Sequence, residues 1–167
     1  FQPYESNMYQ RLGDHAGQLD EWGVTDVWLP PGYRSFGMAR YSEGYAIADR
    51  YDLGEFPSGP GGAKATKYGT SEELKALMDD LHGAGLRGQM DLVPNQVMGL
   101  TGQEAVKVSR VDHYGNRFQN QYTTHKPSEI SDEVYLAYTR GGGPGQEKYG
   151  RIKEFNKNHF NGSSLQQ

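Results

Sequence analysis

The chain has 167 residues, a formal net charge of −4 and no run of basic residues, which argues against a protein that binds nucleic acid through its charge. No apolar run is long enough to span a membrane, and the absence of cysteine excludes disulfides and thiolate metal sites. Hydrophobic residues make up only 35 %, whereas Gly (23) and Tyr (12) are abundant, which favours long polar loops with aromatic platforms.

The first part of the chain alternates predicted strands and helices. Residues 1–4 are predicted to end a strand, and Asn7 is predicted to cap a helix that ends near Gly23. Apolar side chains recur along that helix at spacings of three and four: Met8, Leu12, Ala16 and Leu19. A second strand is predicted over residues 24–29, where two prolines end it.

A long polar segment, residues 33–67, is predicted to be a loop, and ordered loops of this length are usually functional. The next helix is predicted to start with a capping box at Thr70 and to end at Gly83. Residues 86–93 are predicted to form a third strand. The order strand, helix, strand, helix, strand, without hairpin turns, favours parallel β/α units with right-handed connections.

The last 69 or so residues differ in character, because they are rich in glycine and polar side chains. Two strands are predicted there, over residues 103–108 and 134–138, and the glycine run 141–145 is predicted to be an irregular loop. We interpret this part as a subdomain inserted after the third strand. The predicted division is therefore residues 1–98 and residues 99–167.

The chemistry concentrates at the end of the third strand. A short apolar run is stopped there by Pro94, and three polar side chains stand at or just past that end: Asp91, Asn95 and Gln96. Carboxylate and amide groups at a strand end are typical of a site at the carboxyl-terminal rim of a parallel barrel.

Several motifs in this order carry a resemblance to a known family. Residues 44–49, 67–70 and 91–96 resemble the α-amylase superfamily, where they correspond to the second βα loop, the helix after it and the end of the third barrel strand. Three further stretches resemble glycoside hydrolase family 70, which comprises glucansucrases, branching sucrases and starch-converting α-glucanotransferases: residues 27–35, 49–54 and 102–110.

The resemblance implies an α/β fold, a partial TIM (β/α)8 barrel with an inserted irregular β-rich subdomain, called domain B. Residues 1–98 then carry the first three βα units, and residues 99–167 carry part of domain B. Retaining glycoside chemistry needs two carboxylates about 5–5.5 Å apart, and in this superfamily they follow later barrel strands. We therefore assign no catalytic residue to the chain and expect the rest of the barrel to be supplied by the same or another chain.

Three residues are expected to bind substrate by this resemblance. Tyr45 would be the flat platform under a glucosyl ring, although it can equally be one tyrosine filling a loop. Gln96 would hydrogen-bond a glucose hydroxyl, or else satisfy nearby backbone. Asp91 would contact sugar hydroxyls and should be hydrogen-bonded or paired with an arginine, or it serves only as a structural ion pair.

The resemblance also implies a structural calcium ion (Ca2+) at the junction of barrel and domain B, with Asn95 as one ligand. Its other ligands are not identifiable. Sucrose-acting members of the family usually carry Asp at this position, so Asn95 favours a starch-acting 4,6-α-glucanotransferase.

The predicted function is thus part of a retaining α-glucan transglycosylase that uses a covalent glucosyl-enzyme intermediate. A sucrose-dependent glucansucrase or branching sucrase is the first alternative, and a non-catalytic α-glucan-binding module is the second. The expected partners are an α-glucan or sucrose and the rest of the enzyme, with no nucleic acid and no membrane. We expect a secreted bacterial protein.

Overall fold

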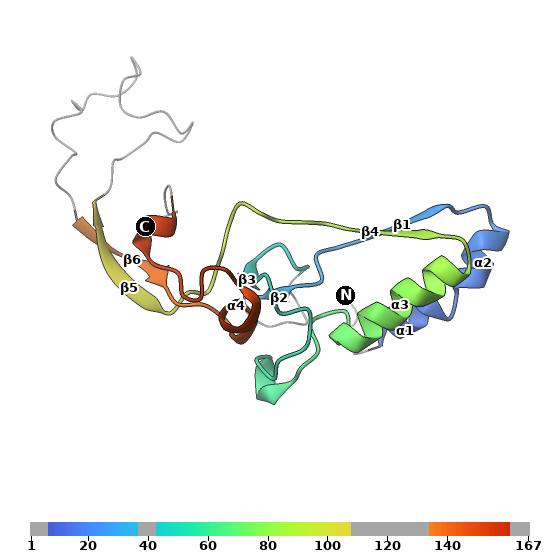
Figure 1. Ribbon diagram of the computed structural model, residues 1–167, viewed down its shortest axis with the longest axis horizontal. Helices are drawn as coiled ribbons and strands as arrows, with labels where there is room; N and C mark the ends of the chain where they lie inside the picture. Colours follow the sequence, from blue (N-terminus) through green and yellow to red (C-terminus); the bar gives the residue numbers. More distant parts are fainter. Residues whose placement is uncertain (1–6, 37–42, 108–133, 161–167) are drawn as a thin grey trace, which may run out of the picture. The chain divides into compact units, whose positions relative to one another are not determined.

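The computed structural model describes residues 7–36, 43–107 and 134–160, as Figure 1 shows. The predicted strand at residues 1–4 lies outside them. The chain divides into two compact units: the first is Phe1–Leu100 with Gly142–Glu154, and the second is Thr101–Gly141 with Phe155–Gln167. Within the described part of the chain, no helix has the length and apolar character that crossing a bilayer requires.

The first predicted helix is two short helices, α1 (Met8–Gly13) and α2 (Ala16–Glu21). The break has a local cause at His15. Its backbone N–H donates to the carbonyl of Leu12 at 3.1 Å. Its ring Nδ1 forms a hydrogen bond with the carbonyl oxygen of Arg11 at 2.7 Å. The imidazole thus replaces the backbone donor that an unbroken helix would use.

The other two strands of the predicted alternation are confirmed with shorter bounds, as β1 (Asp26–Leu29) and β4 (Arg87–Met90). They pair in parallel, from Asp26 opposite Arg87 to Leu29 opposite Met90. The connection between them includes α3 (Ser71–Gly83), so the pair is a βαβ unit.

The helix α3 begins with the predicted capping box. The N–H of Glu73 donates to Thr70 Oγ1 at 3.2 Å, and the N–H of Thr70 donates back to Glu73 Oε2 at 2.7 Å. Two N–H groups that a helix start would leave without partners are thereby satisfied.

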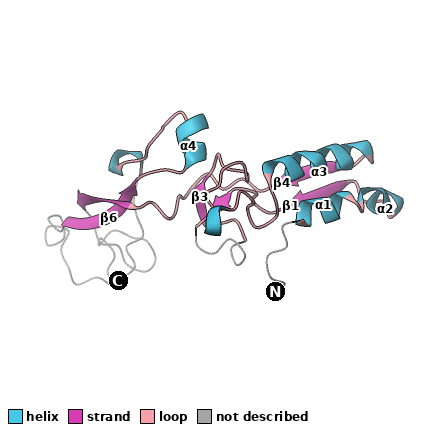
Figure 2. Ribbon diagram, turned by 90° about the horizontal axis from the view of Figure 1, so that it is seen from below, coloured by secondary structure: helices cyan, strands magenta, loops and turns pink. Residues whose placement is uncertain are grey.

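The hydrophobic core of the first unit lies between the strands and the helices. Both α1 and α3 run along one face of the β1–β4 pair (Figures 1 and 2). Its buried members come from the three helices α1, α2 and α3, both strand regions and one loop tyrosine: Tyr9, Ala16, Leu29, Tyr68, Leu74, Leu77, Leu81 and Leu86. Side chains alternate along a strand, so the other face of the pair carries polar and aromatic groups instead: Asp26, Trp28, Arg87 and Gln89.

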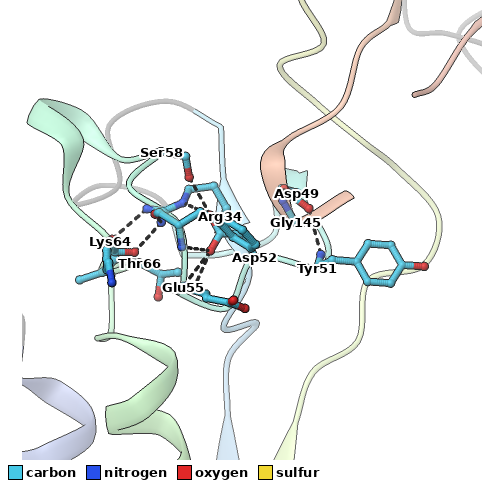
Figure 3. A network of polar contacts seen from close by, with 12 residues as sticks. Arg34, Asp49, Tyr51, Asp52, Glu55, Ser58, Lys64, Thr66 and Gly145 are labelled. Atoms are coloured by element: carbon cyan, nitrogen blue, oxygen red, sulfur yellow. Dashed lines mark hydrogen bonds and ion pairs between the residues drawn. The ribbon is translucent and has the colours of Figure 1, made fainter. Parts of the chain in front are cut away.

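The long segment after β1 is more ordered than a plain loop. It contains the antiparallel strands β2 (Arg34–Ser35) and β3 (Ile47–Asp49) and the 3-10 turn η1 (Pro60–Gly62). A buried ion pair holds it together, because Arg34 Nε donates to Asp52 Oδ2 at 2.9 Å (Figure 3).

Each partner of this ion pair makes further contacts with the loop backbone. The guanidinium of Arg34 also donates to three carbonyls, those of Phe56, Lys64 and Ala65. The carboxylate of Asp52 accepts from Ser58 Oγ and from three backbone N–H groups, those of Gly54, Glu55 and Phe56. Two buried charges, hydrogen-bonded to each other and to the backbone, therefore hold this loop together.

The second unit is built on an antiparallel ribbon of β5 (Gly102–Lys107) and β6 (Val134–Arg140), which confirms both predicted strands. Thr139 Oγ1 donates to Glu104 Oε2 at 2.8 Å across the ribbon. The same carboxylate accepts the N–H of Lys157, where the turn η3 (Lys157–His159) begins, at 2.8 Å.

The prediction that residues 141–145 are irregular was wrong in part, because helix α4 (Pro144–Tyr149) begins inside that run. Pro144 fits the first helical turn, where its missing N–H costs nothing. Asp49 Oδ2 accepts the N–H groups of Gly145 at 2.7 Å and Gln146 at 3.2 Å. A Cβ on Gly143 would lie 2.1 Å from that carboxylate oxygen, so glycine is required for this close approach.

Candidate functional site

The candidate site begins at the carboxyl end of β4, where Asp91 follows the last strand residue. The N–H of Asp91 donates to the carbonyl of Leu29 at 3.0 Å, so the parallel ladder continues up to this carboxylate. Trp28 Nε1 donates to Asp91 Oδ1 at 2.9 Å, and the Tyr45 hydroxyl donates to Asp91 Oδ2 at 2.6 Å. Each carboxylate oxygen thus has one neutral donor, an indole on one side and a phenol on the other.

Tyr45 reaches Asp91 from the segment just before β3. Gly44 precedes it at φ 100°, a backbone conformation that favours glycine, and a Cβ there would lie 2.3 Å from the carbonyl oxygen of Pro31. The close approach to Pro31 brings this segment beside the end of β1. The Tyr45 side chain stays 40 % exposed, so part of its ring is open to a ligand.

Gln96 joins the same cluster through its amide. Its Nε2 donates to the backbone carbonyl of Tyr45 at 3.2 Å. The side chain is otherwise exposed, which leaves one N–H and the amide oxygen facing solvent. The three sequence-predicted substrate-binding residues Tyr45, Asp91 and Gln96 therefore lie together, linked by two hydrogen bonds.

Arg50 ties the backbone of residues 93–96 to the end of β3. Its Nε donates to the carbonyl of Val93 at 3.2 Å, and its Nη2 donates to the carbonyls of Pro94 at 3.3 Å and Gln96 at 3.0 Å. Sequence reasoning did not single out this arginine, because a charged residue in a polar loop is most often solvated. It also did not single out Trp28, which fits the pattern of an ordinary strand residue.

The hydrogen bonds set the charge state of the cluster. The Tyr45 hydroxyl, and secondarily the Trp28 indole, hold the pKa of Asp91 below its ordinary 3.8, because both donate to the ionised form. The bond to Asp91 raises the pKa of Tyr45 above its ordinary value of 10, because the phenol must keep its proton to donate to the carboxylate. At neutral and mildly acidic pH the site therefore presents a charged carboxylate fixed by two neutral aromatic donors.

The expected calcium ligand Asn95 lies on the exposed loop between two carbonyls that Arg50 already binds. Among the residues that the structure describes, no three His, Asp or Glu side chains gather as a metal site would need. Ca2+ requires about six to eight oxygens.

Comparison with known proteins is consistent with this geometry. Residues 5–158 match the family "Glycosyl hydrolase family 70". Glucosyltransferase-I of Streptococcus downei is 32 % identical over 145 residues, which cover 83 % of this chain and 8 % of that protein. Glucan 1,4-alpha-maltohexaosidase of Bacillus sp. (strain 707) is 32 % identical over 161 residues, which cover 96 % of this chain and 28 % of that protein.

A solved structure of alternansucrase in complex with isomaltotriose is also similar, with 33 % identity and a TM-score of 0.66, covering 83 % of this chain and 12 % of that one. The parallel βαβ unit is thus part of a barrel-type fold. The chain belongs to glycosyl hydrolase family 70, an enzyme family that includes glucosyltransferases and lies within the α-amylase superfamily. It spans only 8 % of the length of Glucosyltransferase-I of Streptococcus downei.

Proposed function

We propose that this chain forms one wall of the sugar site of a retaining α-glucan transglycosylase. The observation that carries the proposal is the cluster of Trp28, Tyr45, Asp91 and Gln96 at the strand ends of a chain that matches family 70 over residues 5–158. A glucosyl unit is transferred through a covalent enzyme intermediate to a sugar hydroxyl. The two carboxylates that this chemistry needs belong to other parts of the barrel.

The proposed roles follow from what each group still has available. An ionised carboxylate has about four acceptor positions, and Trp28 and Tyr45 use one on each oxygen of Asp91, so about two remain for sugar hydroxyls. Gln96 keeps one amide N–H and its oxygen. The exposed part of the Tyr45 ring packs against the apolar face of a glucosyl ring.

The donor is either starch-like glucan or sucrose. Asn95, where sucrose-acting members usually carry Asp, favours a starch-acting 4,6-α-glucanotransferase. Among the similar proteins the alternansucrase favours sucrose by its name, whereas the glucan 1,4-alpha-maltohexaosidase favours a starch-like glucan. A sucrose-dependent glucansucrase or branching sucrase is therefore the alternative function of the same site.

The remainder of the enzyme is proposed to cover the solvent-exposed face of the β1–β4 pair, opposite the helices. Parallel strands normally have both faces covered, whereas here Trp28 is 61 % exposed on the face opposite the helices. The proposed division into a barrel part, residues 1–98, and part of an inserted domain B, residues 99–167, also belongs to this proposal. The proposal also includes a calcium ion with Asn95 as one ligand, and secretion of the enzyme from a bacterial cell.

The decisive experiment incubates the complete enzyme with amylose and, separately, with sucrose. New α-1,6 linkages from amylose would support the starch-acting subgroup, and fructose released together with glucan from sucrose would support the sucrose-acting one. Glucose and fructose in equal amounts from sucrose without glucan, or glucose and shorter malto-oligosaccharides from amylose without new linkages, would mean hydrolysis instead of transfer. Binding of glucan without turnover of either donor would overturn the proposal in favour of a binding module.

A further inference from the structure

Arg50 connects the segment that carries Tyr45 to the loop that carries Gln96. We propose that Arg50 is a positioning residue of the sugar site, which fixes the backbone of residues 93–96 and thereby the place of the Gln96 amide. This inference rests on the proposed function, because it assigns Arg50 a task in sugar binding.

The loop that Arg50 binds lacks regular structure of its own. Beyond β4 no strand or helix is formed until β5 at Gly102, so the carbonyls of residues 93–96 have no ladder partner. One guanidinium donates to three of these four carbonyls, at 3.0 to 3.3 Å. A charged donor forms stronger hydrogen bonds than a neutral one, so Arg50 supplies the order that a neighbouring strand would give.

The base of the Arg50 side chain is itself held firmly. On one side Asp49 accepts the N–H of Tyr51 at 3.0 Å and the N–H groups that begin α4. Close by on the other side, Asp52 is fully buried in its ion pair with Arg34 (Figure 3). The guanidinium therefore projects from a turn whose backbone is anchored at two carboxylates.

Gln96 is fixed from the same segment at two points. Its backbone carbonyl accepts from Arg50 at 3.0 Å, and its side-chain amide donates to the carbonyl of Tyr45 at 3.2 Å. If Arg50 is removed, the hydrogen bond from Gln96 Nε2 to the carbonyl of Tyr45 is the one direct contact left, among those described, between Gln96 and this segment. The amide would then sample positions that do not match a bound glucosyl ring, and a misplacement of about 1 Å can reduce turnover by about 100-fold.

The number of contacts explains why arginine is needed. A planar guanidinium reaches three carbonyls at once, whereas an ammonium is a single point charge on a flexible stem. Arg50→Lys keeps the charge and removes the fork, so it separates geometry from electrostatics. Arg151→Lys is a matched control, because Arg151 is an exposed arginine of the same unit.

The test uses the complete enzyme and combines two measurements. The first is amide hydrogen exchange of the peptide that covers residues 92–98, which reports the order of the loop whether or not the enzyme transfers glucose. The second is a double-mutant cycle of Arg50→Lys with Gln96→Ala, read as kcat/KM for transfer from the donor that the enzyme uses.

We expect faster exchange in residues 92–98 and a 10- to 100-fold lower kcat/KM in Arg50→Lys, with Arg151→Lys unchanged in both. In the Gln96→Ala background the further loss from Arg50→Lys should shrink to less than threefold, since Arg50 acts through Gln96. Unchanged exchange, or losses that multiply fully in the double variant, would overturn the inference. If the parent enzyme transfers no glucose, the proposed function fails and hydrogen exchange alone decides whether Arg50 orders the loop.

Discussion

The carboxylate of Asp49, at the end of β3, caps the N-terminus of helix α4, where its partner Gly145 lies 96 residues further along the chain. Its Oδ2 accepts the N–H of Gly145 at 2.7 Å, within the first turn of α4. The residue at the N-cap position, Gly143, has no side chain to do this itself. Asp49 therefore supplies from a distant segment the acceptor that Ser, Thr, Asn or Asp usually supplies locally.

This arrangement predicts that Gly143→Ala separates α4 from β3. The new methyl group would lie 2.1 Å from Asp49 Oδ2, so the carboxylate must move and lose its bonds to the helix. We expect a local destabilisation of about 1–3 kcal/mol, measured as the free energy of opening from amide hydrogen exchange in residues 144–150 of the complete enzyme.

Gly17→Ala is the matched control for this substitution. Gly17 lies inside α2, and a Cβ there would meet no atom within 4 Å. Alanine should stabilise that helix by about 0.5–1 kcal/mol, because glycine is the poorer helix former. Equal effects of the two substitutions would contradict the role given to Asp49.

A second prediction concerns the buried pair of Arg34 and Asp52. Asp52→Asn leaves the guanidinium of Arg34, which is 6 % exposed, without its charged partner. Removing one member of a buried pair costs about 3–5 kcal/mol. We expect faster hydrogen exchange throughout residues 53–66, whereas Asp20→Asn, at an exposed position on α2, should change little.

The same pair should make the loop sensitive to acid. Burial alone would raise the pKa of Asp52, but hydrogen bonds from Ser58 and Arg34 outweigh it and hold the pKa below the ordinary 3.8. A lowered pKa gives stability that is complete above the unfolded value and is lost as pH falls through the folded one. Exchange in residues 53–66 should therefore accelerate below about pH 4, after correction for the intrinsic rate, and Asp52→Asn should abolish that step.

Local patterns were enough to predict much of the fold. The capping box at Thr70, the parallel β/α units and the two strands β5 and β6 each depend on residues close in sequence or on strand periodicity, whereas the pairing of β5 with β6 was not predicted. The break between α1 and α2 was not predictable from apolar spacing, because the ring of His15 competes with the backbone N–H for the carbonyl of Arg11. Apolar periodicity carries no information about such a competition.

The polar contacts that build the site were harder to predict from the sequence. Tyr45, Asp91 and Gln96 came from the family resemblance, and the structure brings them together, while their contact with sugar stays a prediction. Trp28 and Arg50 were missed because their partners lie 63 and 43 to 46 residues away. A pairing of two side chains across such distances leaves no periodic signal in one sequence.

A fourth prediction tests whether Tyr45 is a sugar platform. Tyr45→Ala removes both the ring and the donor to Asp91, so kcat/KM for transfer by the complete enzyme should fall by about 100-fold. Tyr51→Ala is the matched control, because both tyrosine side chains are 40 % exposed and both lie beside β3. A similar loss in both variants would assign Tyr45 a general structural task instead.

The last prediction separates the ring of Tyr45 from its hydroxyl. Tyr45→Phe keeps the platform but removes the largest influence that lowers the pKa of Asp91, so this pKa should rise towards its ordinary 3.8. A carboxylate with a higher pKa is protonated earlier as the medium is acidified, and a protonated Asp91 accepts fewer hydrogen bonds from sugar hydroxyls. The acid limb of the kcat/KM profile should therefore move to higher pH in Tyr45→Phe, and by a smaller step in Trp28→Phe, whose indole is the second influence on the pKa of Asp91.

The carboxyl resonance of Asp91, followed by nuclear magnetic resonance in protein labelled with carbon-13 at aspartate, reports the same pKa without turnover. An acid limb and a resonance that both stay in place in Tyr45→Phe would show that the phenol does not control the charge of Asp91.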